Sequence, residues 1–311
     1  MGIDFNGRVA IVTGAGGGLG RQHALALAAR GAKVLVNDFG GAVGGTASGD
    51  GAAAAPAAER VVQEIVQAGG EAIANGASVT DVEAVEAMVR QAMQAWGRVD
   101  ILINNAGILR DKSFSKITFE DFRAVLDVHL MGAVHCTKAA WEIMKAQNYG
   151  RIVMTTSSSG LYGNFGQSNY GAAKMALVGL MQTLSIEGAR HDIRVNCLAP
   201  TAATRMTAGI LPEAVLKMLE PGAVTPGLLH LVSEDAPTRT ILCAGGGTFA
   251  CANVTMTHGT FVGTGPDAAE SVAAHFAEIA DRAGETVPQS GSEQGRNEVA
   301  QAMQHLSGRP E

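Results

Sequence analysis

The sequence has little concentrated charge and no long apolar run. Of its 311 residues, 17% are charged, the net charge at pH 7 is -6, and Lys and Arg form no run. Nucleic-acid binding needs a concentrated basic surface, so these features argue against it and favour small-molecule partners. The first residues, "MGIDFNGRVAIVTGAGGG", lack the pattern of a secretory signal, and no apolar stretch approaches the ~20 residues of a membrane span. We therefore expect a globular, cytoplasmic protein without a membrane segment, and a hydrophobic content of 47% fits that class.

Cysteine and histidine are also too scattered to indicate a disulfide framework or a metal site. Cys136, Cys197, Cys243 and Cys251 show no CxxC spacing, and the eight histidines form no ligand-type cluster. We therefore expect reduced structural thiols and no bound metal.

What the sequence does contain is a regular alternation of short apolar segments and helix-length amphipathic segments. This alternation predicts an α/β fold, with a single Rossmann-like, doubly wound parallel sheet and helices on both of its faces. Ligands of such sheets gather beyond the carboxyl ends of the strands. The expected strands are "RVAIVTG", "KVLVND", "EAIAN", "DILINNAG", "RIVMTTS", "IRVNCLAP" and "ILCAGGG".

Two regions depart from the alternation within the catalytic domain that we expect over residues 1–255. Residues 39–58, "FGGAVGGTASGDGAAAAPAA", predict a Gly/Ala-rich insertion loop near the cofactor edge. Residues 256–311 predict a C-terminal helical cap, with helices near 267–284 and 293–306. A dispensable appendage is the alternative for this tail.

The segment "VAIVTGAGGGLGRQHALALAARGAKVLVND" predicts a strand, a glycine-rich turn, a helix and a second strand. Gly14, Gly18 and Gly20 allow a tight turn that leaves the N-terminus of the helix facing a pyrophosphate. Asp38 ends the second strand, where a carboxylate would bind an adenosine ribose and repel a 2′-phosphate. This predicts NAD rather than NADP, although an Asp that only caps a loop is the alternative.

Further strand ends carry polar groups that predict an active site. Asn104 to Gly107 can tie neighbouring strands together and let the backbone approach a nucleoside, or can form a simple turn. Ser157 ends a later strand, while Tyr170 and Lys174 lie four residues apart, on one face if the segment is helical. A phenol of pKa ~10 is a poor base near pH 7, but Lys174 and a positively charged nicotinamide would both favour the phenolate. Tyr170 would then exchange the alcohol proton while Ser157 hydrogen-bonds the reacting oxygen.

The motifs "TGAGGGLG", "NNAG", Ser157 and "YGAAK", in this order, resemble the short-chain dehydrogenase/reductase family. Further segments, including "NNAGILRDKSF", "DVHLMG", "APTAATRMT" and the tail through residue 306, resemble the (3R)-hydroxyacyl-CoA dehydrogenase unit of peroxisomal multifunctional enzyme type 2, or type 4 17β-hydroxysteroid dehydrogenase. The resemblance implies a homodimer formed through helices around 120–147 and 170–188. It also implies cofactor contacts at Gly14, Gly18, Leu19, Gly20, Asp38, Ser78, Val79, Asn105, Ala106, Gly107, Tyr170, Lys174, Pro200, Ala202 and Thr204.

Three positions depart from the pattern of the wider family. His129 stands where a catalytic Asn is usual, and either a catalytic contribution or a packed helix residue is possible there. Ala77 and Ser78 stand where an Asp near the adenine is common, so backbone groups or Ser78 must hold the adenine. Pro200-Thr201 replaces the usual Pro-Gly.

The resemblance implies NAD-dependent oxidation of (3R)-3-hydroxyacyl-CoA to 3-oxoacyl-CoA. A 17β-hydroxysteroid dehydrogenase is the alternative enzyme, and a non-catalytic nucleotide-binding scaffold is the remote one. Apolar residues of three loops suit a greasy acyl chain or a sterol, or equally the core: Leu109, Phe114, Leu161, Tyr162, Phe165, Met206 and Met218. Cations that could meet CoA phosphates at the rim are Arg110, Lys112, Lys116 and Arg205.

Overall fold

The structure is a computed structural model that describes residues 2–40, 55–203 and 213–307. Within them, a sheet of eight strands has the order β3-β2-β1-β4-β5-β6-β7-β8. The strands are β1 (Val9–Val12), β2 (Lys33–Asn37), β3 (Glu71–Asn75), β4 (Ile101–Asn104), β5 (Gly150–Thr155), β6 (Ile193–Pro200), β7 (Ile241–Gly245) and β8 (Thr248–Ala252). Strands β1 to β7 pair in parallel, so the predicted sheet and all seven predicted strands are confirmed.

Strand β8 was not predicted from the sequence. It follows β7 after Gly246 and Gly247, both of which have positive φ. Two such residues form the tight turn of a β-hairpin, and a connection this short can join only antiparallel strands. The glycine run therefore ends one strand and begins the next, instead of closing the sheet.

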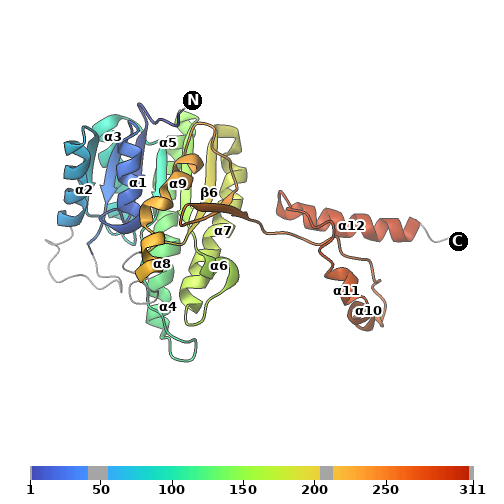
Figure 1. Cartoon of the computed structure of the whole chain (residues 1–311). Coiled ribbons are helices and arrows are strands. Elements are labelled where there is room, and N and C mark those ends of the chain that lie inside the picture. The colour runs from blue at the N-terminus through green and yellow to red at the C-terminus, as the bar shows by residue number, and fades with distance from the viewer. Residues whose placement is uncertain (1, 41–54, 204–212, 308–311) are drawn as a thin grey trace. The chain divides into compact units, whose positions relative to one another are not determined.

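Helices cover both faces of the sheet, as expected for strands that are apolar on both sides (Figure 1). Helix α1 (Gly18–Ala28) packs against α2 (Ala55–Gln67) and α9 (Thr225–Leu231) on one face, whereas α3 (Val82–Trp96) packs against α5 (Gly132–Gln147). The remaining helical elements of this part are α4 (Phe119–Leu126), η1 (Asp127–Met131), α6 (Ser158–Tyr162), α7 (Ser168–Gly188), η2 (Ala189–His191), α8 (Glu213–Met218) and η3 (Pro221–Ala223).

Helix α2 begins at Ala55, so residues 55–58 are helical and do not belong to the predicted insertion loop. Ala58 is fully buried in the core between the helices and the sheet, which explains why the helix extends this far. The rest of the predicted loop lies largely outside the described residues. The four cysteines are free. None of the helices in the described ranges is long and apolar enough to cross a membrane.

Contacts divide the chain into two compact units, Met1–Cys251 and Ala252–Glu311. The second unit contains α10 (Ala268–Ala274), α11 (Phe276–Ile279) and α12 (Gly291–Ser307), and its loop is held by an antiparallel bridge between Met256 and Thr286. The helix expected near 267–284 is therefore broken at His275 and ends earlier. Among residues 252–307 none is buried. The role of this unit as a cap stays a prediction.

Candidate active site

The carboxyl end of β5 and the start of α7 bring the three predicted catalytic residues together. Ser157 follows β5 and caps α6, where its hydroxyl accepts a hydrogen bond from the Ser159 N–H at 3.2 Å. Tyr170 and Lys174 lie one turn apart on α7, and the Lys174 Nζ is 5.4 Å from the centre of the Tyr170 ring. The Ser157 hydroxyl forms a hydrogen bond with the phenol that lowers its pKa. The i to i+4 spacing therefore places an ammonium beside a phenol.

Without a cofactor, the electrostatics of the Tyr170–Lys174 pair are dominated by burial. Burial raises the pKa of the Tyr170 phenol above its usual value, and the Asp111 charge raises it further, against the opposing effect of Ser157. Burial also lowers the pKa of Lys174 to about 7, and its Nζ donates to the backbone oxygen of Thr155. A lysine with this pKa is only half charged at neutral pH. Desolvation of both groups therefore opposes the effect that Lys174 alone would have on the phenol.

His129 lies in η1, a π-helical turn between α4 and α5, with its ring edge-on to Tyr170 at 5.2 Å between centroids. Its Nε2 faces the backbone of Ile108, 2.8 Å from the oxygen and 3.1 Å from the nitrogen. Burial, and then the charge of Lys174, hold the pKa of His129 well below its usual value, so the ring is neutral at pH 7. A Cβ at Gly107 would lie 2.3 Å from the His129 ring, so only glycine fits against it.

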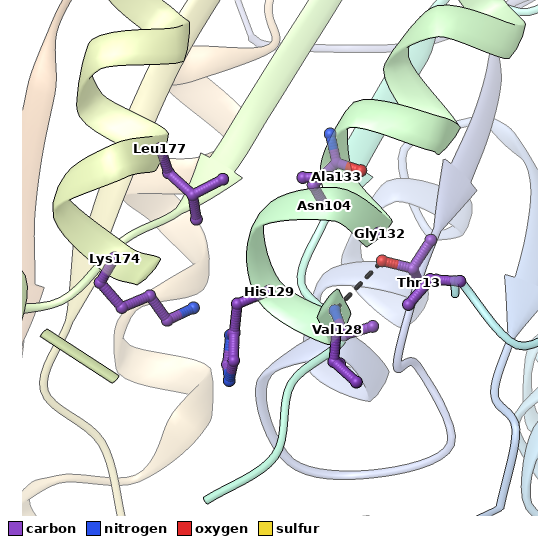
Figure 2. Close-up of a pocket in the computed structure, with 10 residues that line it drawn as sticks. Thr13, Asn104, Val128, His129, Gly132, Ala133, Lys174 and Leu177 are labelled. Atoms are coloured by element: carbon purple, nitrogen blue, oxygen red, sulfur yellow. Dashed lines mark hydrogen bonds between the residues drawn. The ribbon is translucent and has the colours of Figure 1, made fainter. Parts of the chain in front are cut away.

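A cavity of about 10 Å³, room for about one water molecule, lies among these groups. Figure 2 shows Lys174 extending from α7 toward His129 across this space. The Nδ1 of His129 and the Oδ1 of Asn104 are buried and have no hydrogen-bond partner among the described residues. Other residues that line the cavity are Thr13, Val79, Ala106, Val128, Gly132, Ala133 and Leu177. Its polar atoms could bind a water and pass a proton.

The predicted nucleotide loop lies at the same edge of the sheet. Helix α1 begins after Gly17, where no side chain of the described residues caps its free N–H groups, and a Cβ at Gly17 would meet no described atom within 4 Å. N-terminal N–H groups without a side-chain cap, next to a position with free space, fit a pyrophosphate. The Asp38 carboxylate accepts the N–H groups of Gly16 at 2.7 Å and Gly40 at 2.8 Å. Asp38 therefore caps this loop, which was the alternative interpretation of this residue. It also follows the end of β2, the position from which a carboxylate would bind the adenosine ribose.

The "NNAG" segment is tied to the glycine loop. The Asn105 side chain donates to the backbone oxygens of Thr13 and Gly14 at 2.9 and 3.1 Å, and the Ala106 N–H donates to the Thr13 hydroxyl at 3.1 Å. A Cβ at Gly14 would lie 2.8 Å from the Cα of Ala106. Thr13 was not among the predicted site residues, although its place directly before the glycine run was a usable signal.

The other predicted cofactor contacts are spread over several elements of the fold. Val79 is buried and its backbone oxygen accepts from His135 at 2.9 Å, while the Ser78 hydroxyl bonds that of Thr80 at 2.8 Å. Leu19 lies in α1, Pro200 ends β6, and Ala202 follows it. Thr204, Arg205 and Met206 lie outside the described residues.

Within the part of the chain that the structure describes, most of the predicted substrate residues are exposed. Large exposed fractions are found for Phe114 (77%), Tyr162 (72%), Phe165 (90%) and Met218 (70%). Leu109, in the loop after β4, is half-buried. A cavity of about 540 Å³ lies beside η1 and α5 and is lined by Ile108 and Arg110, the two neighbours of Leu109. Arg110 and Lys112, the proposed phosphate contacts, both bind Asp121, at 2.7 and 2.9 Å.

The sheet order, the uncapped glycine loop and the Ser-Tyr-Lys cluster together define a nucleotide-dependent oxidoreductase of the doubly wound class. Residues 8–214 match the short chain dehydrogenase family, and the chain belongs to this family of NAD(P)-dependent oxidoreductases.

Among its relatives, the peroxisomal multifunctional enzyme type 2 of Drosophila melanogaster is 56% identical over 233 residues, which cover 75% of this chain and 38% of that protein. A short-chain type dehydrogenase/reductase of Mycobacterium tuberculosis is 47% identical over 278 residues, 89% of this chain and 95% of that one. The solved full-length Drosophila enzyme superposes with a TM-score of 0.79 at 36% identity, covering 98% of this chain and 51% of that chain. The sequence match thus covers 38% and the structural match 51% of the Drosophila enzyme, so the chain spans at most about half the length of that relative.

Proposed function

We propose that the protein oxidises (3R)-3-hydroxyacyl-CoA to 3-oxoacyl-CoA with NAD. The observation that carries this proposal is the meeting of Ser157, Tyr170 and Lys174 at the edge of the sheet that also holds the uncapped glycine loop. The similarity to two fungal relatives named peroxisomal hydratase-dehydrogenase-epimerase supports the acyl-CoA class of substrate.

Bound NAD would supply a hydride acceptor whose nicotinamide ring is positively charged. Ser157 hydrogen-bonds the hydroxyl oxygen of the substrate and orients it toward Tyr170. Tyr170, as the phenolate that the pyridinium charge would favour, accepts the hydroxyl proton while the C–H bond gives up its hydride, so the alcohol becomes a ketone and the phenolate becomes a phenol. Lys174, with a pKa of about 7, can hold the released proton near neutral pH and pass it through the small cavity beside His129.

Other residues position these groups or select the cofactor. His129 is neutral and fixes both Ile108 and the Tyr170 ring, so we assign it a positioning role. The Asp38 carboxylate favours NAD because it would repel a 2′-phosphate. We also propose a homodimer, a cap formed by residues 256–311, and a cytoplasmic location, the last against the peroxisomal names of several relatives.

A 17β-hydroxysteroid dehydrogenase is the second candidate. It is favoured by the similarity to a 7α-hydroxysteroid dehydrogenase complexed with NADH and 7-oxo glycochenodeoxycholic acid, with a TM-score of 0.69 at 30% identity. Comparing kcat/KM for 3-hydroxyacyl-CoA and for estradiol separates the two, and a tenfold steroid preference would overturn the acyl-CoA assignment.

The proposal is tested with Tyr170→Phe and Tyr149→Phe, assayed with both enantiomers of short and long 3-hydroxyacyl-CoA. Removing a general base lowers the rate by about 10²–10⁴-fold, so Tyr170→Phe should lose nearly all activity. Tyr149 lies at the opposite edge of the sheet, between the guanidinium groups of Arg8 and Arg151, and its variant should keep the wild-type rate. Full activity of Tyr170→Phe, or an inactive wild type on every acyl-CoA, would reject the assignment.

A further inference from the structure

We propose that Thr156 is a positioning residue that sets the distance between the Ser157 strand end and the helix carrying Tyr170 and Lys174. This inference rests on the proposed function of the Ser-Tyr-Lys cluster and assigns to it a residue outside the three. Thr156 stands directly before Ser157, is 1% exposed, and was given no role of its own from the sequence.

The backbone of Thr156 is hydrogen-bonded to the sheet, and the side chain of Thr156 is hydrogen-bonded to α7. Its N–H donates to the backbone oxygen of Leu198 on β6 at 2.8 Å, which fixes the residue relative to the strands. Its hydroxyl donates to the backbone oxygen of Lys174 at 2.6 Å. A carbonyl inside a helix already accepts the bond of its own turn, so this second, buried donor specifically ties the helix to the strand end.

Two more contacts hold Lys174 at the same place. Its Nζ donates to the backbone oxygen of Thr155, the residue before Thr156. A Cβ at Gly160 would lie 2.8 Å from the Lys174 Cβ, so α6 and α7 are in close contact there. Lys174 is therefore held through its side chain, its carbonyl and its Cβ by the six-residue segment 155–160. Only the tie from Thr156 is made by a side chain that can be removed without changing the backbone.

A shift of α7 would act on Tyr170 through identifiable groups. Those that face the phenol are Lys174 on its own helix, Ser157 from the strand end, His129 from η1 and Asp111 from the loop after β4. Of these contacts, the hydrogen bond with Ser157 depends most directly on the distance between the strand end and α7. Loosening the tie should weaken that bond and raise the pKa of Tyr170, because Ser157 lowers it.

The experiment compares Thr156→Val, which keeps the shape and removes the hydroxyl, with Thr156→Ser, which restores it. For Thr156→Val we expect the pH at which kcat is half-maximal to rise by about 0.5–1 unit. Below that pH, kcat should be about three- to tenfold lower than in the wild type, and KM should change by less than about twofold. Thr156→Ser should return both to near wild type. The control is Ser185→Ala, which removes another buried hydroxyl-to-carbonyl bond on α7, to Gln182 at 2.8 Å, and should lower only the Tm.

An unchanged pH profile in Thr156→Val, with or without a lower Tm, would overturn the proposal and leave Thr156 a structural residue. If the valine variant does not fold, Thr156→Cys, a smaller change with a weaker donor, carries the same comparison.

A second measurement needs no turnover. The absorbance of tyrosinate is titrated without substrate, and Tyr170 is isolated by subtracting the titration of the Tyr170→Phe protein. A higher pKa in Thr156→Val supports the positioning role even if the wild type oxidises no acyl-CoA, and an unchanged value contradicts it even if the enzyme is active.

Discussion

Lys174→Met should make the cofactor-free protein more stable at neutral pH, although it removes a residue of the proposed active site. The lysine is 3% exposed, and burial lowers its pKa from 10.5 to about 7. In the unfolded chain it keeps its proton up to about pH 10.5, so the unfolded state binds more protons between pH 7 and 10.5 and stability rises with pH in that window. At about 1.4 kcal/mol per pKa unit, the penalty is roughly 4 kcal/mol at pH 7 and roughly 2 kcal/mol at pH 9.

Methionine occupies a similar volume without a charge, so it removes this penalty and loses one hydrogen bond to Thr155, worth about 1 kcal/mol. Urea unfolding of both proteins at pH 7 and pH 9 gives the free energies. The advantage of Lys174→Met should be near 3 kcal/mol at pH 7 and should shrink by about 2 kcal/mol at pH 9. The exposed Lys138, changed to Met, controls for loss of a lysine. An advantage that is the same at both pH values would refute the desolvation of Lys174.

Two further predictions concern the edges of the sheet. Asp38→Asn removes the carboxylate charge and keeps an acceptor for the Gly16 N–H. The ratio of kcat/KM with NADP to kcat/KM with NAD should therefore rise by about tenfold or more. A constant ratio would contradict the proposed contact between Asp38 and the ribose. Arg151→Met leaves several buried acceptors unpaired, which include the backbone oxygens of Ser233 and Glu234. The free energy of unfolding, measured by urea titration, should therefore fall by about 3–5 kcal/mol. A loss below about 1 kcal/mol would show that water replaces the guanidinium.

Much of the fold could be predicted because its signals are local. Apolar runs such as "VAIV" and "ILIN" lie between glycines or helix-length segments, and a parallel sheet buried on both faces requires such runs. Strand β8 was missed because its residues are mostly exposed and carry no alternating pattern. The break at His275 has no proline or glycine to mark it, so the sequence predicted one helix where the structure has two.

Contacts in the site were predictable where the spacing of residues within one helix or strand determines them. Contacts between segments that are distant in the sequence were not predictable. The four-residue interval placed Tyr170 beside Lys174, but the bonds from Thr156 to Lys174 and from His129 to Ile108 join residues 18 and 21 positions apart on different elements. Desolvation is likewise a property of the folded chain. In the protein without a cofactor it raises the pKa of Tyr170, an effect that no feature of the sequence could indicate.

Buried polar groups are fully paired at the start of strand β5, whereas several of them lack a hydrogen-bond partner among the described residues at its other end. At its start, Arg151 is fully buried, and its guanidinium donates to backbone oxygens and to the Asp192 carboxylate, which satisfies each of its nitrogens. At its other end, Asn104, His129 and Thr155 each leave a buried polar atom without a partner among the described residues, and Lys174 is held where its charge is disfavoured. Stability alone would select against this second arrangement, since each unpaired buried group costs about 1–3 kcal/mol. Other such atoms of the described residues, Nε2 of His23 and Oε1 of Gln182 among them, have no buried lysine of lowered pKa beside them, whereas Asn104 and His129 line one cavity with Lys174. Unpaired groups around a destabilised charge persist where a bound molecule or a moving proton uses them, which fits the catalytic edge.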